Sequence, residues 1–417
     1  MSDRGAQPFD AIVLGAGPSG VAAALGIARL GYRTAIVTRP RSPSVEGLSG
    51  RAFARLIDTG LDRVARCASA PAARLVYWAG SRSVRGQESV IKREEFDSQL
   101  RAALIGSPVQ WLDAAVRRIR FENGVWQIET SSAILSSRAV LDARGRRARR
   151  CDHRGPLLAA WSAICPSDEW SAPRSAVAAL DDAWCWFART DDGLLFLQVV
   201  GAADEHASHH RFTATILAAA RVLPEFGLTP ERASTVAATG ARAAVARFSR
   251  PSQGAGYLRI GDAAVAMDPL SGNGIYEALR SAHVATAAVN SYLLGAEWAV
   301  LARFVDEQAR ELWRRSVTVA AYFYRAQAAH TRGEFWTHAA SKYEKAALDA
   351  RVTEQGPGRF EMRPVLDGQR IDVRRVWVSS DYPRGVWKVN GRSLDQMPPE
   401  LIPSVVLRAA SDFHQEV

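Results

Sequence analysis

The sequence predicts an α/β protein in which a nucleotide-binding domain is joined to a β-rich domain and a small C-terminal module. Three observations predict this fold class: an N-terminal βαβ unit with a glycine-rich turn, a second glycine-rich strand–turn–helix segment beginning near residue 257, and strand-like alternation between residues 151 and 250. At 417 residues, the chain is long enough for two domains and a small third one.

The N-terminal unit combines a buried strand over residues 9–14, a helix over residues 21–30 and a second strand over residues 33–37. The turn after the first strand reads Gly15-Ala-Gly17-Pro18-Ser19-Gly20. In such a frame the first glycine makes the turn, the second admits a pyrophosphate, and the third lets helix and strand pack closely. We therefore predict that Gly15, Gly17, Pro18, Ser19 and Gly20 bind a dinucleotide.

The second glycine-rich segment begins as a strand over residues 257–260 and ends at Gly261-Asp262. Its turn holds Pro269, Gly272, Asn273 and Gly274, and a helix starts at Ile275. Glycines let the backbone approach a flat ligand, and the helix start directs free N–H groups and a positive end toward that ligand. Asp262 can accept hydrogen bonds from a polyol chain.

This segment resembles the second FAD-binding motif of the flavoprotein hydroxylase superfamily. The resemblance implies that Asp262 holds the ribityl chain, and that the turn from Pro269 to Gly274, with Ile275, faces the pyrimidine edge of the flavin. NADP-binding Rossmann domains do not need a second motif of this kind. The two motifs together therefore favour FAD as the cofactor.

One position departs from the superfamily pattern. The acidic residue expected at the end of the second strand, on the adenosine ribose, is Thr38, and Arg39 follows it. A threonine hydroxyl bonds a ribose more weakly than a carboxylate does, and the pair alternatively suggests an NADP site with arginine on the 2′-phosphate. We include both residues among the candidate FAD contacts.

Further resemblances add candidate cofactor contacts. Glu46-Gly-Leu-Ser49 is similar, with the order changed, to a Gly-Glu-Ser-type turn beside the flavin ring, and Arg93 matches the arginine of an Arg-x-x-Phe-Asp element that contacts FAD. The alternative for Arg93 is a helix start with surface charge. Val116 resembles an adenine contact. Asp142-Ala-Arg-Gly145-Arg resembles the Asp-Ala-Thr-Gly-Arg motif, which lies close to the pyrophosphate.

The resemblance implies an aromatic-hydroxylase-like fold: a Rossmann-like FAD-binding domain with an interleaved β-sheet substrate domain. We assign residues 1–75, 88–150 and 251–295 to the first, 76–87 and 151–250 to the second, 296–355 to a helical segment and 356–417 to a C-terminal α/β module. In the tail we expect helices over 297–315, 317–329 and 399–410, and strands over 370–378 and 385–389. Trp161, Trp184 and Trp186 are candidates for the substrate pocket, with core packing as the alternative.

The resemblance implies an FAD-dependent monooxygenase that uses NAD(P)H and O2 to hydroxylate an electron-rich aromatic substrate. The layout and the basic charge are also similar to the flavoprotein monooxygenases of tryptophylquinone biogenesis, which hydroxylate a protein-bound tryptophan. A halogenase is the first alternative, although the position of its lysine is occupied by Ala70. A prenyl reductase-like oxidoreductase and a non-catalytic FAD-binding partner also stay open. No residue is predicted as a catalytic acid or base.

The net charge of +10 comes almost entirely from arginine, and suits an acidic peptide or protein as substrate as well as an aromatic small molecule. We expect no nucleic-acid partner, because no binding motif accompanies the arginines, and no membrane partner, because no apolar run is long enough. Four cysteines without Cys-x-x-Cys spacing predict reduced thiols and a cytoplasmic protein. His206, His209 and His210 have no paired ligand set nearby, so we expect no metal. The oligomeric state stays open.

Overall fold

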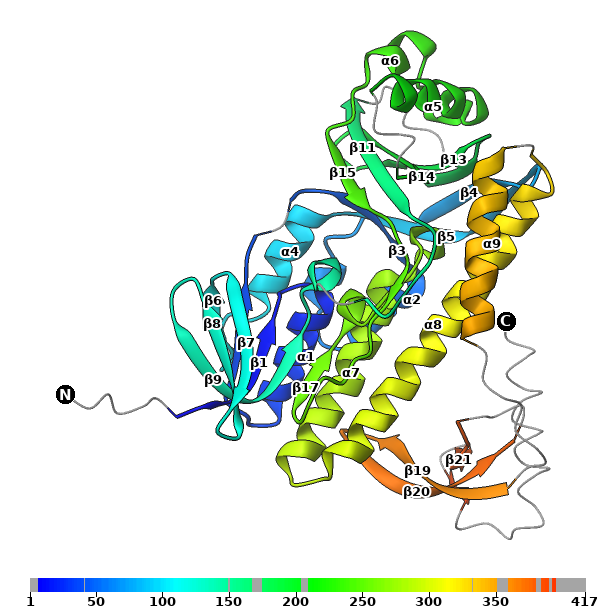
Figure 1. Ribbon diagram of the computed structural model, residues 1–417. Helices are drawn as coiled ribbons and strands as arrows, with labels where there is room; N and C mark the ends of the chain where they lie inside the picture. Colours follow the sequence, from blue (N-terminus) through cyan, green and yellow to red (C-terminus); the bar gives the residue numbers. More distant parts are fainter. Residues whose placement is uncertain are drawn as a thin grey trace.

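The computed structural model describes residues 7–40, 42–148, 151–166, 175–203, 209–331, 333–350, 359–379, 384–389 and 392–394. Two large sheets organise this part of the chain, and long helices connect and cover them (Figure 1). We call them sheet A, which carries the N-terminal βαβ unit, and sheet B, which lies beyond its carboxyl edge. The structure is therefore the mixed α/β fold that the sequence predicts.

Sheet A has seven strands in the order β6-β2-β1-β9-β8-β7, with β17 also paired to β9. Its strands are β1 (Phe9–Leu14), β2 (Thr34–Thr38), β6 (Gln110–Asp113), β7 (Val116–Glu122), β8 (Val125–Thr130), β9 (Ile134–Asp142) and β17 (Tyr257–Arg259). The β6, β2, β1, β9 and β17 strands run parallel. Their carboxyl ends consequently meet at one edge, where open parallel sheets bind ligands.

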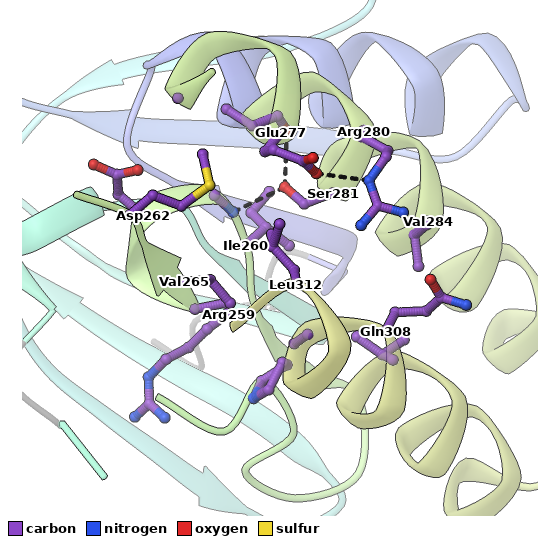
Figure 2. A pocket seen from close by; sticks show the side chains of 18 residues that line it. Arg259, Ile260, Asp262, Val265, Glu277, Arg280, Ser281, Val284, Gln308 and Leu312 are labelled. Atoms are coloured by element: carbon purple, nitrogen blue, oxygen red, sulfur yellow. Dashed lines mark hydrogen bonds and ion pairs between the residues drawn. The ribbon is translucent and has the colours of Figure 1, made fainter. Parts of the chain in front are cut away.

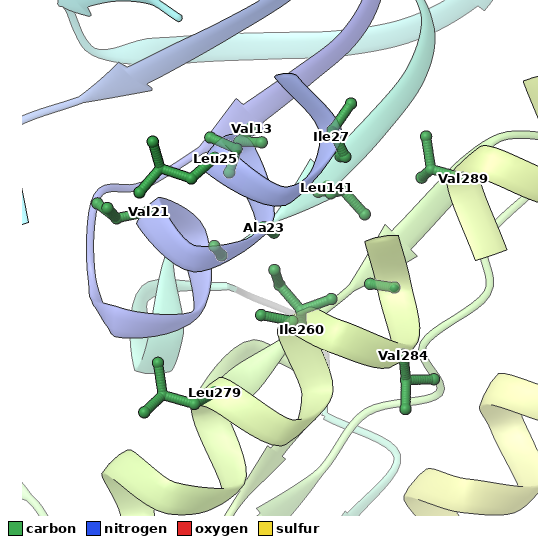
Figure 3. Close-up of a cluster of buried hydrophobic side chains, with 14 of the residues drawn as sticks. Val13, Val21, Ala23, Leu25, Ile27, Leu141, Ile260, Leu279, Val284 and Val289 are labelled. Carbon is green, nitrogen blue, oxygen red and sulfur yellow. The ribbon is translucent and has the colours of Figure 1, made fainter. Parts of the chain in front are cut away.

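Helices α1 (Pro18–Arg29) and α7 (Gly274–Leu293) pack together on one face of sheet A. Their apolar side chains form one core with those of β1, β9 and the end of β17 (Figure 3). The two helices approach closely at Gly26, where an added Cβ would lie 2.9 Å from Thr286 Oγ1. This packing fixes the first turn of α1 next to the first turn of α7. Shorter helices α2 (Gly50–Asp58), α3 (Asp62–Ala65) and α4 (Arg93–Ala102) extend the layer.

Sheet B has eight strands in the order β15-β11-β14-β13-β12-β4-β5-β3. Its strands are β3 (Val45–Ser49), β4 (Ala72–Trp78), β5 (Ser81–Lys92), β11 (Leu158–Pro166), β12 (Ser175–Ala179), β13 (Ala183–Arg189), β14 (Leu194–Ala202) and β15 (Gly240–Ala243). Because β3 pairs with β5, residues 45–49 form a strand and not the turn that the sequence resemblance implied. One face of the sheet packs on α5 (His209–Val222) and α6 (Pro230–Thr235).

The other face of sheet B packs on two long helices and on the segment after β17. These helices are α8 (Trp298–Ala328) and α9 (Glu334–Asp349). The prediction of separate helices over 297–315 and 317–329 is wrong, because α8 continues through Ser316, whose hydroxyl bonds back to the Trp313 carbonyl. A three-stranded ribbon of β10 (His153–Arg154), β16 (Arg247–Phe248) and β18 (Val265–Ala266) joins the two sheets.

The C-terminal module contains a hairpin that the sequence only half predicts. Its second strand, β20 (Arg370–Val378), is confirmed, but its partner β19 (Arg359–Asp367) was not expected. Short strands β21 (Lys388–Val389) and β22 (Arg392–Ser393) follow, so the strand predicted over 385–389 is shorter than expected. The helix predicted over 399–410 lies outside the described residues. In the described part of the chain, no helix is both long and apolar enough to cross a bilayer.

Candidate cofactor and substrate site

The two glycine-rich turns meet at the carboxyl edge of sheet A, although they lie far apart in the sequence. A Cβ placed on Gly261 would lie 2.6 Å from Ser19 Oγ, so the end of β17 touches the first turn of α1. The Ala143 amide bonds the Leu14 carbonyl at 2.8 Å, which brings the 142–145 segment to the same place. Three predicted motifs are therefore joined in one site.

The first turn has the geometry that a pyrophosphate needs. Gly15 has a φ of +104°, and its Cβ position lies 2.6 Å from the Ala143 carbonyl oxygen. A Cβ on Gly20 would lie only 1.9 Å from the Gly15 carbonyl oxygen. Gly17 caps α1 without a side-chain hydrogen bond, so first-turn N–H groups remain available to an anion.

Thr38 supports this turn directly. Its hydroxyl accepts a hydrogen bond from the Ala16 amide at 3.2 Å, so part of its bonding capacity holds the loop in place. Arg39 follows at the surface, and Val116 is half-buried at the start of β7. The structure places Thr38 within the first turn's hydrogen-bond network and leaves Arg39 at its outer end.

Arg93 is buried at the start of α4 and lies between two carboxylates. Its guanidinium pairs with Asp97 and lies 3.7 Å from Glu46 on β3, while its Nε has no hydrogen-bond partner among the described residues. The alternative of a helix start with surface charge is therefore wrong for Arg93, which is only 3% exposed. Glu46 and Arg93, two candidate cofactor contacts, form one group.

Asp142 ends β9 and its carboxylate is buried. It accepts hydrogen bonds from Arg144 Nε at 2.8 Å, from Arg144 Nη2 at 2.7 Å and from the Tyr257 hydroxyl at 2.8 Å. Burial by itself raises the pKa of Asp142, but the Arg144 and Tyr257 bonds outweigh it and the pKa lies below its ordinary value. Asp142 thus joins β9, β17 and the Gly145 turn. Both oxygens of its carboxylate accept hydrogen bonds from side chains of the protein.

The lowered pKa makes a prediction about stability. An aspartate with a folded-state pKa below its unfolded value, about 3.9, stabilises the fold above that value and loses this contribution as pH falls through the folded pKa. Asp142→Asn should therefore cost about 3 kcal/mol at neutral pH and should flatten the loss of stability in acid. Urea unfolding of both proteins at several pH values measures this. An unchanged pH slope in the variant would contradict it.

The second turn places a carboxylate and a helix start beside the first. Asp262 is 39% exposed and lies 3.5 Å from the Arg146 guanidinium, while the Gly261 amide donates to Ser281 Oγ at 2.9 Å. Gly272 has a φ of +62°. Asn273 caps α7 without a side-chain hydrogen bond, and no atom lies within 4 Å of a Cβ position at Gly274. The α7 start is therefore open to a flat ligand.

A buried network fixes this turn from behind. Asp268 accepts hydrogen bonds from the Tyr324 hydroxyl on α8, at 3.1 Å, and from the Tyr343 hydroxyl on α9, and its side chain also caps the Leu270 amide. The Tyr324 hydroxyl in turn accepts from Trp184 Nε1 at 3.0 Å. Burial raises the pKa of Asp268 despite these bonds. The network ties the Pro269–Gly274 turn to sheet B and to both long helices.

The three candidate tryptophans do not share a pocket. Trp184 and Trp186 belong to the core between sheet B, α8 and α9, whereas Trp161 packs on the opposite face, against α5. Alternation along a strand shows which side chains share a face of the sheet, but it does not show which helices pack on that face. The sequence therefore could not separate Trp161 from Trp184 and Trp186. Trp161 is thus separated by the whole sheet from the second turn, and only Trp184 and Trp186 lie on its side.

Sequence reasoning missed an ion pair on this same face of sheet B. Glu88 on β5 is 5% exposed and accepts hydrogen bonds from Ser175 Oγ at 2.6 Å and from Trp186 Nε1 at 3.3 Å. Arg74 on β4 lies 3.8 Å from Glu88. A charged residue in a strand reads as a solvent-facing position in sequence, so no signal distinguished either residue.

A small pocket lies behind the second turn, between α7 and α8 (Figure 2). Its volume is about 50 Å³, enough for a few water molecules and far too small for a dinucleotide. Glu277, Arg280 and Gln308 line it, and Asp262 points away from its centre. Gly261, Asp262 and Gly274 of the second glycine-rich segment also line this pocket.

The residues present fit a bound dinucleotide. One turn offers uncapped amides where a Cβ is excluded, a partly exposed carboxylate lies beside it, and a second open helix start follows. Beyond the second turn, sheet B, α8 and α9 enclose an apolar core that includes Trp184, Trp186 and Tyr324. The fold and this site define a flavoprotein of the aromatic-hydroxylase class.

Comparisons with solved structures agree with this class. The peptidyl tryptophan dihydroxylase QhpG, which is essential for tryptophylquinone cofactor biogenesis, superposes with a TM-score of 0.80 at 30% identity over 95% of both chains. The chain therefore belongs to the family of FAD-dependent monooxygenases that includes QhpG, and it is an FAD-dependent aromatic hydroxylase.

Two further solved structures share the fold. The flavin-dependent halogenase CmlS matches with a TM-score of 0.71 at 17% identity, over 94% of this chain and 87% of its own. The p-nitrophenol 4-monooxygenase PnpA from Pseudomonas putida matches with a TM-score of 0.57 at 19% identity, over 82% of this chain and 92% of its own. No protein-family model matches the chain.

Proposed function

We propose that this enzyme uses NAD(P)H and O2 to hydroxylate a tryptophan side chain of a peptide or protein during the biogenesis of a tryptophylquinone cofactor. The observation that carries the proposal is the match to QhpG over 95% of both chains at 30% identity. A TM-score of 0.80 over that share of both chains means that the overall architecture is shared.

The site geometry supports an assignment of residues to the cofactor. In this assignment the backbone N–H groups of Gly17, Ser19 and Gly20 bind the pyrophosphate, with Pro18, which has no N–H, in the same turn. Asp262 binds the ribityl hydroxyls, and the start of α7 approaches the ring. Bound FAD, once reduced, supplies the activation of O2 for transfer of one oxygen atom to an electron-rich arene.

The protein's own part is to position and enclose the reactants. The Asp268–Tyr324–Tyr343 network ties the second turn to α8 and α9, and an apolar core around Trp184 and Trp186 lies on the same face of sheet B. The substrate indole is assigned to the space between this face and the α7 start. The chain's excess of arginine suits a peptide that carries acidic side chains.

Oxygen uptake by the purified yellow protein tests this proposal. With NADH or NADPH present, a short acidic peptide that contains tryptophan should stimulate O2 consumption at least tenfold over the rate without peptide, a change of about 1.4 kcal/mol in the barrier. The same peptide with phenylalanine in place of tryptophan is the matched control and should not stimulate it. Equal rates with both peptides would contradict tryptophan as the substrate.

A further inference from the structure

The ion pair between Arg74 and Glu88 lies on the face of sheet B that meets the second turn. Residues 264–270 pack on this face together with Val177 and Trp186. A Cβ placed on Gly272 would lie 3.4 Å from Arg74 Nη1, which would be its nearest neighbouring atom. The guanidinium of Arg74 therefore lies directly against the glycine turn that precedes α7.

The surroundings of Glu88 hold its carboxylate in one place. Ser175 Oγ and Trp186 Nε1 both donate to Oε2, and Oε1 lies 3.8 Å from Arg74. A Cβ on Gly47 would lie 2.2 Å from Oε1, so the carboxylate lies directly against the backbone of the neighbouring strand. Four strands of sheet B thus position a single negative charge, and that charge holds Arg74.

Arg74 itself is incompletely bonded. Its Nε is buried and has no hydrogen-bond acceptor among the described residues, while its side chain as a whole is 21% exposed. A buried ion pair costs desolvation energy that is recovered only when the remaining donors also find partners. The free Nε and the exposed part of the guanidinium therefore call for an acceptor that is not one of the described side chains.

We propose that Arg74, held by Glu88, contacts the flavin ring at the second turn and stabilises the negative charge of the reduced cofactor. This inference rests on the proposed placement of the ring at the α7 start. Hydride transfer from NAD(P)H delivers two electrons and one proton to the oxidised flavin, yielding NAD(P)+ and an anionic reduced flavin. A cation near the ring favours the reduced form, and a carboxylate behind that cation opposes it.

The two members of the pair must then shift the midpoint potential of bound FAD in opposite directions. Removing the positive charge in Arg74→Gln should weaken binding of reduced relative to oxidised FAD about tenfold, which lowers the potential by about 30 mV for a two-electron couple. Removing the negative charge in Glu88→Gln, which keeps the acceptor oxygen for Ser175 and Trp186, should raise it. Arg74→Lys keeps the charge and should retain most of the wild-type potential.

Dye-coupled reduction of the FAD-loaded proteins measures these potentials, and Arg101→Gln, in an exposed pair with Asp113, is the control that should not shift. Potentials that move in the same direction in Arg74→Gln and Glu88→Gln, or that do not move, would overturn the proposal. If the pair had a purely structural role, the direction of the shift in potential would not depend on the sign of the charge that is removed. If Arg74→Gln does not fold, the sign of the Glu88→Gln shift decides. Failure here leaves peptide hydroxylation by the wild type intact, so the two proposals are tested separately.

Discussion

A Gly20→Ala variant is expected to bind no FAD and to lose roughly 3 kcal/mol of folding stability. The added Cβ would lie 1.9 Å from the Gly15 carbonyl oxygen and 3.2 Å from Ala143 Cβ. The nearest of these atoms is backbone, which cannot rotate away as a flexible side chain can. The turn must therefore open, and the N–H groups of Gly17, Ser19 and Gly20 would no longer converge on a pyrophosphate.

The matched control is Gly50→Ala at the first residue of α2, where no atom lies within 4 Å of the Cβ position. Its stability should change by no more than about 0.5 kcal/mol. Absorbance of bound flavin after gel filtration and thermal unfolding measure both variants. Retention of stoichiometric FAD by Gly20→Ala would show that the first turn does not hold the pyrophosphate.

An Asp268→Ala variant is expected to lose roughly 3–5 kcal/mol of stability. The substitution leaves the buried hydroxyls of Tyr324 and Tyr343 and the Leu270 amide without their acceptor. It also disconnects the second turn from α8 and α9, so FAD affinity should fall as well. The large effect arises because three donors depend on one carboxylate.

Urea unfolding of the Asp268→Ala protein, with Tyr343→Phe as its partial counterpart, measures this network. Tyr343→Phe removes one donor and leaves Asp268 bonded to Tyr324 and Leu270, so its loss should be about 1 kcal/mol. Equal losses in the two variants would mean that Asp268 is not the centre of the network.

The sequence was sufficient to predict that the two glycine-rich turns lie together, because the residues of each turn are contiguous. Gly15–Gly20 and Gly261–Gly274 each follow a strand and precede a helix, and carboxyl ends of parallel strands meet at one edge. The joining of these turns is thus a consequence of their strand–turn–helix pattern. Asp142 was recognised by its motif, but its bonding to Tyr257 depends on β9 and β17 being neighbours.

The part of the site that sheet B, α8 and α9 contribute could not be predicted, because its residues are joined only by long-range pairing. Arg74 and Glu88 come from two strands of a bulged hairpin, and Asp268 meets tyrosines from two helices beyond the motif. Trp161 was grouped with Trp184, although the register of sheet B directs the two side chains to opposite faces. β19 escaped prediction because charged residues and Pro364 interrupt its alternation.

The mass of a tryptophan-containing peptide after turnover under 18O2 tests the central claim most directly. We expect that the FAD-loaded enzyme, given NAD(P)H, adds oxygen to the indole ring and that each added atom carries the 18O label, because the oxygen comes from O2 that is activated next to the second turn. Unlabelled oxygen in the product, or NAD(P)H oxidation that yields only hydrogen peroxide and an unmodified peptide, would contradict it.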